Sequence, residues 1–375
     1  MPPTTMSKPK RILYFINDLF GGGAQNGLIN LLNAGFFNGT ELHVAAIIRG
    51  DGCVEAELLK HIPASRLHIF SGSERMKLPH LLRAMRLYPR LLLSLRPQIT
   101  ILSLPQANLV GRFWGHLLPI TRLFVFEHST AYAKKAYAYL LKALSLSVYG
   151  ILTDTNRTTT ETTRHFLPLR SYKVVEIPLF TGQVNPAYLK TTTKIGKTPR
   201  LLIAGRLSHA KNHAGLFHAL QILKGQGVPF HLSIAGNGEL EPELKALASQ
   251  LDIAENLTFL GYLSPWTAQC PLADIYLQPS FREGLCLTVV EAMSHGLPVI
   301  ASSRGGMLDY GHDGENIVFA DPDSPPDLAA KIASVIADDK LRSRLSKNAM
   351  SSMEARFSLK ALNARLAEAR MEVGF

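Results

Sequence analysis

The chain has 375 residues, of which 46% are hydrophobic, and this is enough for two or three domains with ample cores. Its net charge is +11, and the whole excess lies in residues 1–180, which hold 21 Lys and Arg against 10 Asp and Glu, whereas residues 181–375 hold 19 of each. Such an asymmetry indicates an anionic partner for the first half. Charges or prolines interrupt every apolar stretch, which excludes a membrane-spanning helix, and three cysteines without metal-ligand spacing are typical of free thiols in the cytoplasm.

Apolar strands and helical segments alternate along the chain, as in open parallel sheets. Residues 1–9 predict a disordered tail, 10–180 a first α/β domain, and the polar residues 181–199 a linker. Residues 200–356 predict a second α/β domain, and 357–375 a final helix. The predicted strands are residues 11–17, 42–48, 99–102, 123–126, 151–153 and 174–177 in the first domain, and 201–204, 231–235, 257–260, 275–277, 299–301 and 317–319 in the second.

The richest polar segment follows the predicted strand at residues 275–277. Glu283 lies in a loop, and Glu291 lies about two turns into a helix predicted for residues 285–295, on the same face as Thr288. A strand, loop and helix in this order leave backbone N–H groups free at the carboxyl edge of a parallel sheet, where a phosphate or a sugar hydroxyl can accept from them. The two carboxylates could hold separate parts of a long ligand, or they could be an ordinary loop Glu and an ordinary surface Glu.

The spacing of this segment resembles the nucleotide-sugar site of retaining glycosyltransferases of family 4. The family pattern is a Glu, seven residues, a second Glu and then a Gly-x-Pro-Val strand, here Gly296 to Val299. The resemblance implies two Rossmann-like domains that face each other across a cleft (the GT-B architecture), with a C-terminal helix that crosses back to the first domain. It also implies that Glu291 binds the ribose hydroxyls and Glu283 the donor sugar.

The same resemblance extends the donor site to the start of the predicted helix. The backbone of three consecutive residues would face the sugar and the phosphate, with Thr288 in the same site. These residues are Gly284, Leu285 and Cys286.

A second motif follows the first strand of the second half. Arg206 and Lys211 lie five residues apart in a loop before a helix predicted to start at about His213, where a forked guanidinium and a point charge could pair with a diphosphate. The alternative is two solvated loop cations. The spelling matches the family motif Gly-Arg-Leu-x-x-x-Lys-Asn, whose Arg and Lys stabilise the leaving diphosphate.

Glycine-bearing turns follow three other strands. Gly22 and Gly23 open the first helix and would let a ligand approach the backbone, or they form a tight structural turn. In the family this loop approaches the donor phosphate. Gly236 corresponds to a turn at the edge of the base pocket, and Tyr262 follows a strand whose backbone contacts the base; both are also common as plain turns.

His128 ends a buried strand of the first half. Such a His is often a hydrogen-bonded structural residue, but the family has a His near the 6-position of the donor sugar, so we expect His128 in the catalytic set with Arg206, Lys211 and Glu283. The segment from Asp321 to Ser324 spells Asp-x-Asp, a metal signature of a different glycosyltransferase class. It lies between a strand and a helix, where Asp and Ser cap and turn the chain, so we expect no metal and no cofactor.

Two basic, leucine- and tyrosine-rich segments, residues 77–96 and 132–149, could lie on an anionic membrane surface or pack as ordinary core-facing helices. No nucleic-acid-binding motif accompanies them. The sequence thus predicts a metal-independent retaining glycosyltransferase that uses a nucleotide diphosphate sugar, UDP favoured over GDP, and a glycan or lipid-linked acceptor in cell-surface polysaccharide synthesis. We expect it in the cytoplasm or at the inner face of the membrane. The alternatives are a sugar-nucleotide epimerase and an inactive sugar-nucleotide-binding module at the membrane.

Overall fold

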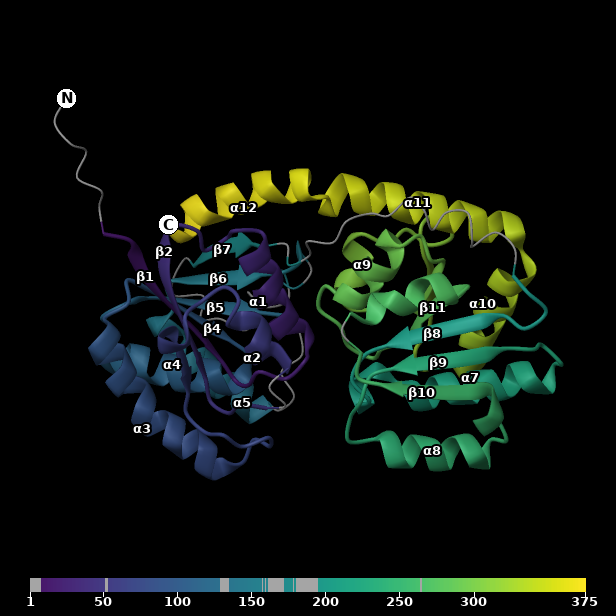
Figure 1. The fold of residues 1–375 in the computed structure, drawn as a ribbon, viewed down its shortest axis with the longest axis horizontal. Helices are drawn as coiled ribbons and strands as arrows, with labels where there is room; N and C mark the ends of the chain where they lie inside the picture. The colour runs from purple at the N-terminus through teal and green to yellow at the C-terminus, as the bar shows by residue number, and fades with distance from the viewer. Residues whose placement is uncertain are drawn as a thin grey trace. The chain divides into compact units, whose positions relative to one another are not determined.

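The computed structural model describes residues 8–50, 53–128, 135–156, 158, 160, 172–177, 179, 195–263 and 265–375. The chain forms two compact units (Figure 1). Unit 1 comprises residues 1–179 and 363–375, and unit 2 comprises residues 180–362. The predicted tail lies mostly outside the described residues, as do residues 181–194 of the predicted linker.

Unit 1 is built on a seven-stranded parallel sheet with the order β3-β2-β1-β4-β5-β6-β7. The chain starts in the middle, moves to one edge and then returns to build the other half, so the strand order reverses between β1 and β4. The strands are β1 (Lys10–Ile16), β2 (Thr40–Ala46), β3 (Leu67–Ile69), β4 (Ile99–Ser103), β5 (Arg122–Glu127), β6 (Gly150–Thr153) and β7 (Lys173–Glu176). The helices are α1 (Gly23–Asn33), α2 (Cys53–Leu58), α3 (Leu78–Leu95), α4 (Pro105–Leu117) and α5 (Lys135–Ala143).

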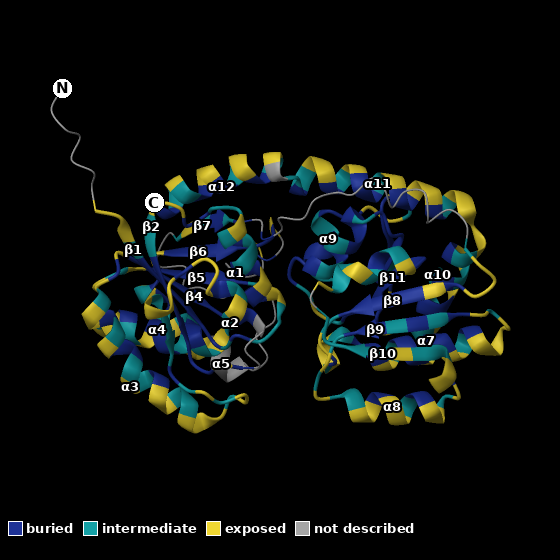
Figure 2. Cartoon of the chain, viewed as in Figure 1, coloured by how far each residue is buried: buried dark blue, intermediate teal, exposed yellow. Residues whose placement is uncertain are grey.

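The central strands of unit 1 are buried along most of their length (Figure 2). This follows from their nearly continuous apolar runs, which suit a parallel sheet covered by helices on both faces. Phe15 of β1 stacks on Tyr88 of α3, with ring centroids 4.6 Å apart, and also contacts Phe70. The core therefore fixes α3 through Ala84, Tyr88 and Leu92, which recur every four residues on one helix face.

The last helix, α12 (Leu359–Val373), belongs to unit 1 from Asn363 onward. Arg365 donates to Glu176 of β7 at 2.6 Å, and Arg370 donates to backbone carbonyls of residues 35–38. The ring of Phe375 packs on Phe36 and Phe37. These contacts join the C-terminus to the first half of the chain.

Unit 2 contains a six-stranded parallel sheet with the order β10-β9-β8-β11-β12-β13, which reverses between β8 and β11. The strands are β8 (Arg200–Ala204), β9 (His231–Ala235), β10 (Leu257–Gly261), β11 (Ile275–Gln278), β12 (Val299–Ser302) and β13 (Val318–Ala320). The helices are α7 (His213–Gly225), α8 (Glu241–Gln250), α9 (Leu287–Ser294), α10 (Pro325–Ala337) and α11 (Asp339–Phe357).

The expected fold class is confirmed, with each of the twelve predicted strands present within two residues of its predicted ends. Strand β3 was not predicted, because it has only three residues, all half-buried at the edge of the sheet. The helix predicted for 285–295 starts two residues later, at Leu287, because Cys286 takes a left-handed conformation (φ 59°) that a helix cannot include. No helix among the described residues is long and apolar enough to cross a membrane.

Candidate functional site

The carboxyl ends of β8 and β11 flank the reversal point of the unit 2 sheet. Loops that leave two such strands diverge toward opposite faces of the sheet and open a crevice, which is the usual ligand position in open α/β sheets. The loop after β8 carries Arg206 and Lys211, and the loop after β11 carries Glu283. The chain therefore places the predicted cations and the first predicted carboxylate at this one edge.

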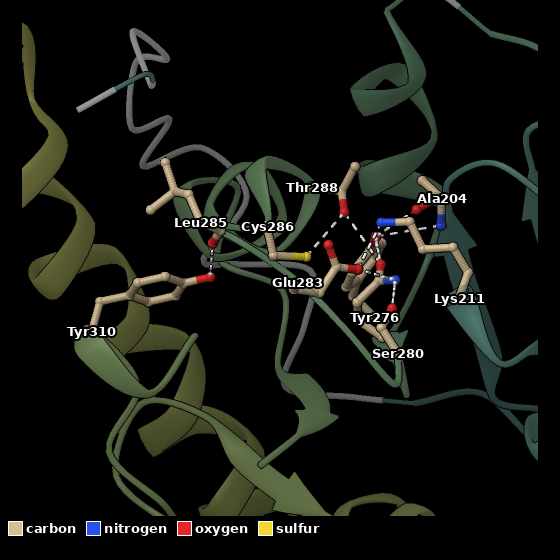
Figure 3. A network of polar contacts seen from close by, with 10 residues as sticks. Ala204, Lys211, Tyr276, Ser280, Glu283, Leu285, Cys286, Thr288 and Tyr310 are labelled. Atoms are coloured by element: carbon tan, nitrogen blue, oxygen red, sulfur yellow. Dashed lines mark hydrogen bonds and ion pairs between the residues drawn. The ribbon is translucent and has the colours of Figure 1, made fainter. Parts of the chain in front are cut away.

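Lys211 and Glu283 form an ion pair with Nζ and Oε1 2.6 Å apart, joining the loops across the reversal point (Figure 3). The two side chains are 21% and 9% exposed. Burial alone would lower the pKa of Lys211, but the Glu283 carboxylate outweighs it and raises that pKa. Lys211 therefore stays charged at neutral pH.

The buried side-chain amide of Gln278 hydrogen-bonds to Glu283. Its Nε2 donates to Ser280 Oγ at 2.7 Å and to Glu283 Oε1 at 3.4 Å, and its Oε1 accepts from Tyr276 at 2.8 Å and from Thr288 at 3.2 Å. All four hydrogen-bonding positions of the amide are thus used inside a fully buried strand end. Figure 3 shows this network running from the end of β8, where Tyr276 bonds to Ala204, to the first turn of α9.

The two carboxylate oxygens of Glu283 are used differently. Oε1 accepts from both Lys211 and Gln278. Oε2 makes no hydrogen bond to any residue that the structure describes. One oxygen is therefore held by the protein, and the other is available to accept from a ligand hydroxyl.

Two backbone carbonyls of the turn before α9 accept hydrogen bonds from the segment that follows β12. Gly306 donates its amide to the Gly284 carbonyl at 2.9 Å, and the Tyr310 hydroxyl donates to the Leu285 carbonyl at 2.8 Å. The Cys286 thiol lies 3.7 Å from Thr288 Oγ1, and burial raises its pKa to about 12, so it stays protonated. The amides of residues 284–286 make no hydrogen bond within the described part of the chain.

Glu291 lies in the second turn of α9, and Trp266 Nε1 donates to its Oε2 at 2.6 Å. Burial raises the pKa of Glu291 to about 7, although the bond from Trp266 opposes the rise. The Trp266 ring also packs on Tyr276, with centroids 5.3 Å apart. Glu291 is thus not the exposed surface residue that was the alternative from sequence. Its carboxyl group can gain or lose a proton near pH 7.

Asn212 was not predicted as a site residue, although it completes the Lys-Asn motif. It is 5% exposed and left-handed (φ 56°), and its Nδ2 donates to the carbonyls of Pro279 at 3.1 Å and Pro322 at 2.8 Å. Its Oδ1 accepts from the Gly215 amide and caps α7. Asn212 therefore ties together the loops after β8, β11 and β13.

The other predicted donor residues of unit 2 line the loops after β8, β9 and β10. Arg206 is 60% exposed, and its Nε lies 3.6 Å from Glu239 Oε2. The Gly236 amide donates to the Gly261 carbonyl at 2.7 Å, next to Tyr262. A Cβ at Gly236 would meet the Gly205 carbonyl at 1.9 Å, so a glycine is needed where these loops touch.

In unit 1, His128 is held in a polar array at the ends of β4, β5 and β6. Its Nε2 lies 2.9 Å from Ser103 Oγ, and its Nδ1 lies 3.8 Å from Asp154 Oδ2. Its ring also packs on Phe126. Both ring nitrogens thus face protein groups in this structure, and sequence reasoning missed Ser103 and Asp154 because they lie 25 and 26 residues away.

The loop of Gly22 and Gly23 forms the start of α1. The Gly22 amide donates to the Phe20 carbonyl at 2.9 Å, and Gly22 has an extended conformation with φ −131°. Neither glycine has the positive φ that would require its residue type. The geometry here is that of the tight turn considered from sequence.

The Asp-x-Asp segment caps a helix, as expected. Ser324 accepts from the Asp327 amide at the start of α10, and Arg304 pairs with Asp321 and Asp323. Among the residues that the structure describes, no group of His, Cys, Asp and Glu is arranged to hold a metal ion.

Residues 185–352 match the family model "Glycosyl transferases group 1". Curated relatives include the alpha-D-kanosaminyltransferase of Streptomyces kanamyceticus, 26% identical over 50% of this chain and 49% of the relative, and the lipopolysaccharide core biosynthesis glycosyltransferase LpsE of Rhizobium meliloti, 26% identical over 52% and 56%. The matched part of the chain thus spans about half the length of these relatives.

Solved structures match over nearly the whole chain. Anabaena HepE in complex with UDP-glucose has a TM-score of 0.75 at 19% identity, covering 96% of this chain and 98% of that one. The lipopolysaccharide outer core galactosyltransferase WaaB has a TM-score of 0.67 at 18% identity, with the same coverage. Residues 185–352 are therefore similar to the glycosyl transferases of group 1, and the chain shares with these solved glycosyltransferases the GT-B fold of two Rossmann-like units.

Proposed function

We propose that the chain is a retaining, metal-independent glycosyltransferase that takes a sugar from a nucleotide diphosphate sugar, UDP favoured over GDP. The observation that carries this proposal is the Lys211–Glu283 pair across the reversal point of the unit 2 sheet. The family match to residues 185–352 and the fold likeness to HepE, which was solved with UDP and with UDP-glucose, support the donor class.

Each donor group has a proposed partner in unit 2. Lys211 and Arg206 neutralise the diphosphate, aided by the free amides before α9. The unbonded Oε2 of Glu283 accepts from a sugar hydroxyl, and Glu291 accepts from the ribose hydroxyls. Ionised Glu291 is the better acceptor, so ribose binding favours its charged form and releases a proton near pH 7.

The proposed reaction is a same-face substitution. The bond between the anomeric carbon and the diphosphate oxygen breaks, and a bond from the acceptor hydroxyl forms on the same face. The acceptor proton passes to the departing phosphate oxygen. Glu283 is held as an ion pair by Lys211, which suits an acceptor of hydrogen bonds rather than a nucleophile. Lys211 supplies the positive charge that a metal ion would otherwise bring to the leaving group.

We further propose that the acceptor is a glycan or lipid-linked glycan bound by unit 1, at the inner face of a cytoplasmic membrane. The positive charge of residues 1–180 and the names of relatives such as LpsE support this part.

The first test is calorimetric binding of UDP, GDP and their glucose derivatives with and without EDTA. The proposal expects tight UDP binding that survives EDTA, weakens in Lys211→Met and Glu291→Gln, and is unchanged in the exposed controls Lys347→Met and Glu255→Gln. Binding that requires a divalent cation, or no binding of any nucleotide, contradicts it.

A second test concerns stereochemistry. Transfer to a synthetic acceptor, followed by proton NMR of the product, is expected to show the anomeric configuration of the donor. An inverted product, or a covalent glycosyl-enzyme trapped with a slow donor, would overturn the mechanism. Conversion of the sugar nucleotide without any acceptor would indicate an epimerase.

A further inference from the structure

The two oxygens of the Glu291 carboxylate have different surroundings. Trp266 Nε1 donates to Oε2 at 2.6 Å. Oε1 makes no hydrogen bond to any residue that the structure describes, and it is not sealed from solvent. A ligand that approaches Glu291 therefore meets one oxygen that the protein already engages and one that is open.

The indole that engages Oε2 is held in place. Trp266 is the first residue of the 3-10 helix Trp266–Leu272, which packs against β8 and α9. Its ring packs on Tyr276, with centroids 5.3 Å apart. Tyr276 is 0% exposed, and its hydroxyl is hydrogen-bonded to the Ala204 carbonyl at 3.1 Å. Because the ring lies against a buried and anchored side chain, the indole N–H cannot turn away from Glu291 without a movement of the whole segment.

This arrangement affects how Glu291 can hold a ribose. A ribose presents two neighbouring hydroxyls, and a carboxylate holds both best when each of its oxygens accepts from one of them. In this chain the second hydroxyl would have to share Oε2 with Trp266, whose bond is short and whose ring occupies space beside that oxygen. Only Oε1 is therefore well placed to accept from the ribose.

We propose that Trp266 is a specificity-determining residue of the donor site, because it engages Oε2 and limits Glu291 to a single ribose hydroxyl. The inference rests on the proposed role of Glu291 at the ribose and narrows that contact. A site that bonds both hydroxyls rejects every nucleotide that lacks one of them. This site should instead admit one class of deoxyribonucleoside diphosphate, the class that lacks the hydroxyl which Glu291 does not hold.

The test is calorimetric binding of UDP, 2′-deoxy-UDP and 3′-deoxy-UDP to the full chain, at a pH well above 7 so that Glu291 is ionised. We expect one deoxy analogue to bind within about twofold of UDP and the other to bind about tenfold more weakly, as for the loss of one hydrogen bond to a charged group.

Two variants separate the indole N–H from the ring. Trp266→Phe keeps an aromatic ring on Tyr276 but removes the donor, so Oε2 becomes open and both deoxy analogues should bind about tenfold more weakly than UDP. The matched control is Trp114→Phe, which removes the indole N–H that donates to the Met85 carbonyl in unit 1. It should keep the unequal pattern of the parent chain.

Equal losses for the two analogues on the parent chain would overturn the inference. So would an unequal pattern that persists in Trp266→Phe, because a Trp266 that only supports the fold does not choose between the hydroxyls. The parent measurement needs no variant and decides the point even if Trp266→Phe does not fold. Failure of the proposed function is a different result, since the parent chain would then bind no UDP at all.

Discussion

The strand order reverses once in each of the two parallel sheets, but different groups occupy the two reversal points. In unit 1 the Asn17 side chain closes the point between β1 and β4, accepting from the Ala107 amide at 2.8 Å in the first turn of α4. In unit 2 a partly exposed ion pair, Lys211 with Glu283, occupies the corresponding place. The same backbone plan can therefore present helix-start groups to a ligand or satisfy them internally, depending on one or two side chains.

The charged pairs of the two units differ in the same way. Arg112 of unit 1 is 1% exposed, donates to Glu127 at 2.9 Å and also holds the Leu141 carbonyl of α5. Lys211 of unit 2 keeps 21% of its side chain exposed. We therefore expect charge removal in unit 1 to affect stability, and charge removal in unit 2 to affect activity.

The largest effect is expected for Glu127→Gln. It leaves the Arg112 guanidinium buried without a counter-charge, which costs about 3–5 kcal/mol. Thermal melting should show unit 1 unfolding at a clearly lower temperature, while Glu255→Gln, an exposed site, melts like the parent. An unchanged melting temperature would mean that the buried pair does not distinguish unit 1 from unit 2.

Next comes Lys211→Met, which should lower kcat about 10²–10³-fold, as expected when a group that stabilises developing negative charge is removed. Its melting temperature should fall less than that of Glu127→Gln, since the Lys211 side chain is 21% exposed whereas that of Arg112 is 1% exposed. Steady-state kinetics beside Lys347→Met tests this. If Lys211→Met lost stability but kept kcat, the unit 2 pair would serve the fold rather than the reaction, contrary to our expectation.

Glu291→Gln is expected to separate stability from binding. Its folded pKa, about 7, is above the ordinary 4.5, so the folded state holds the extra proton and stability falls as pH rises from about 4.5 to 7. Gln stays neutral and avoids this loss, so the variant should be more stable at pH 8, by up to about 3 kcal/mol, and equal to the parent at pH 4. It should nevertheless bind UDP more weakly. Melting curves across this pH range check the sign, and equal curves at pH 8 would refute it.

Gln278→Leu should lower kcat about tenfold by loosening Glu283, since small misplacements of catalytic groups are costly. Tyr276→Phe is the comparison, because it removes a different bond of the same amide without touching Glu283. If the two variants lose kcat equally, then Gln278 supports the fold rather than the position of Glu283.

The smallest effect is expected for Asn17→Ala. It removes the acceptor of the Ala107 amide in the first turn of α4 and should lower the unfolding free energy of unit 1 by about 1 kcal/mol. Hydrogen exchange at the Ala107 amide measures this directly. Unchanged protection would mean that Asn17 does not close the reversal point.

Much of the fold was predictable because strands of a covered parallel sheet are continuous apolar runs that need no partner to be seen. The exceptions have local causes: β3 is too short for a pattern, and Cys286 takes a left-handed conformation that delays α9. In the candidate site, Glu283 and Lys211 were visible from their motifs. Their direct pairing was not, because they are 72 residues apart.

The sequence by itself determined the alternation of strands and helices, the two-unit plan and the residue types at the unit 2 edge, since periodicity and motif spacing are local properties. Only the tertiary structure decided which partners these residues have. Gln278 and Trp266 carry no motif, yet they set the bonding of Glu283 and Glu291 because β11, the segment around Trp266 and α9 meet there. The neighbours of His128 were also decided by the tertiary structure. Its two ring nitrogens face Ser103 and Asp154 because the ends of β4, β5 and β6 meet at one edge of the sheet.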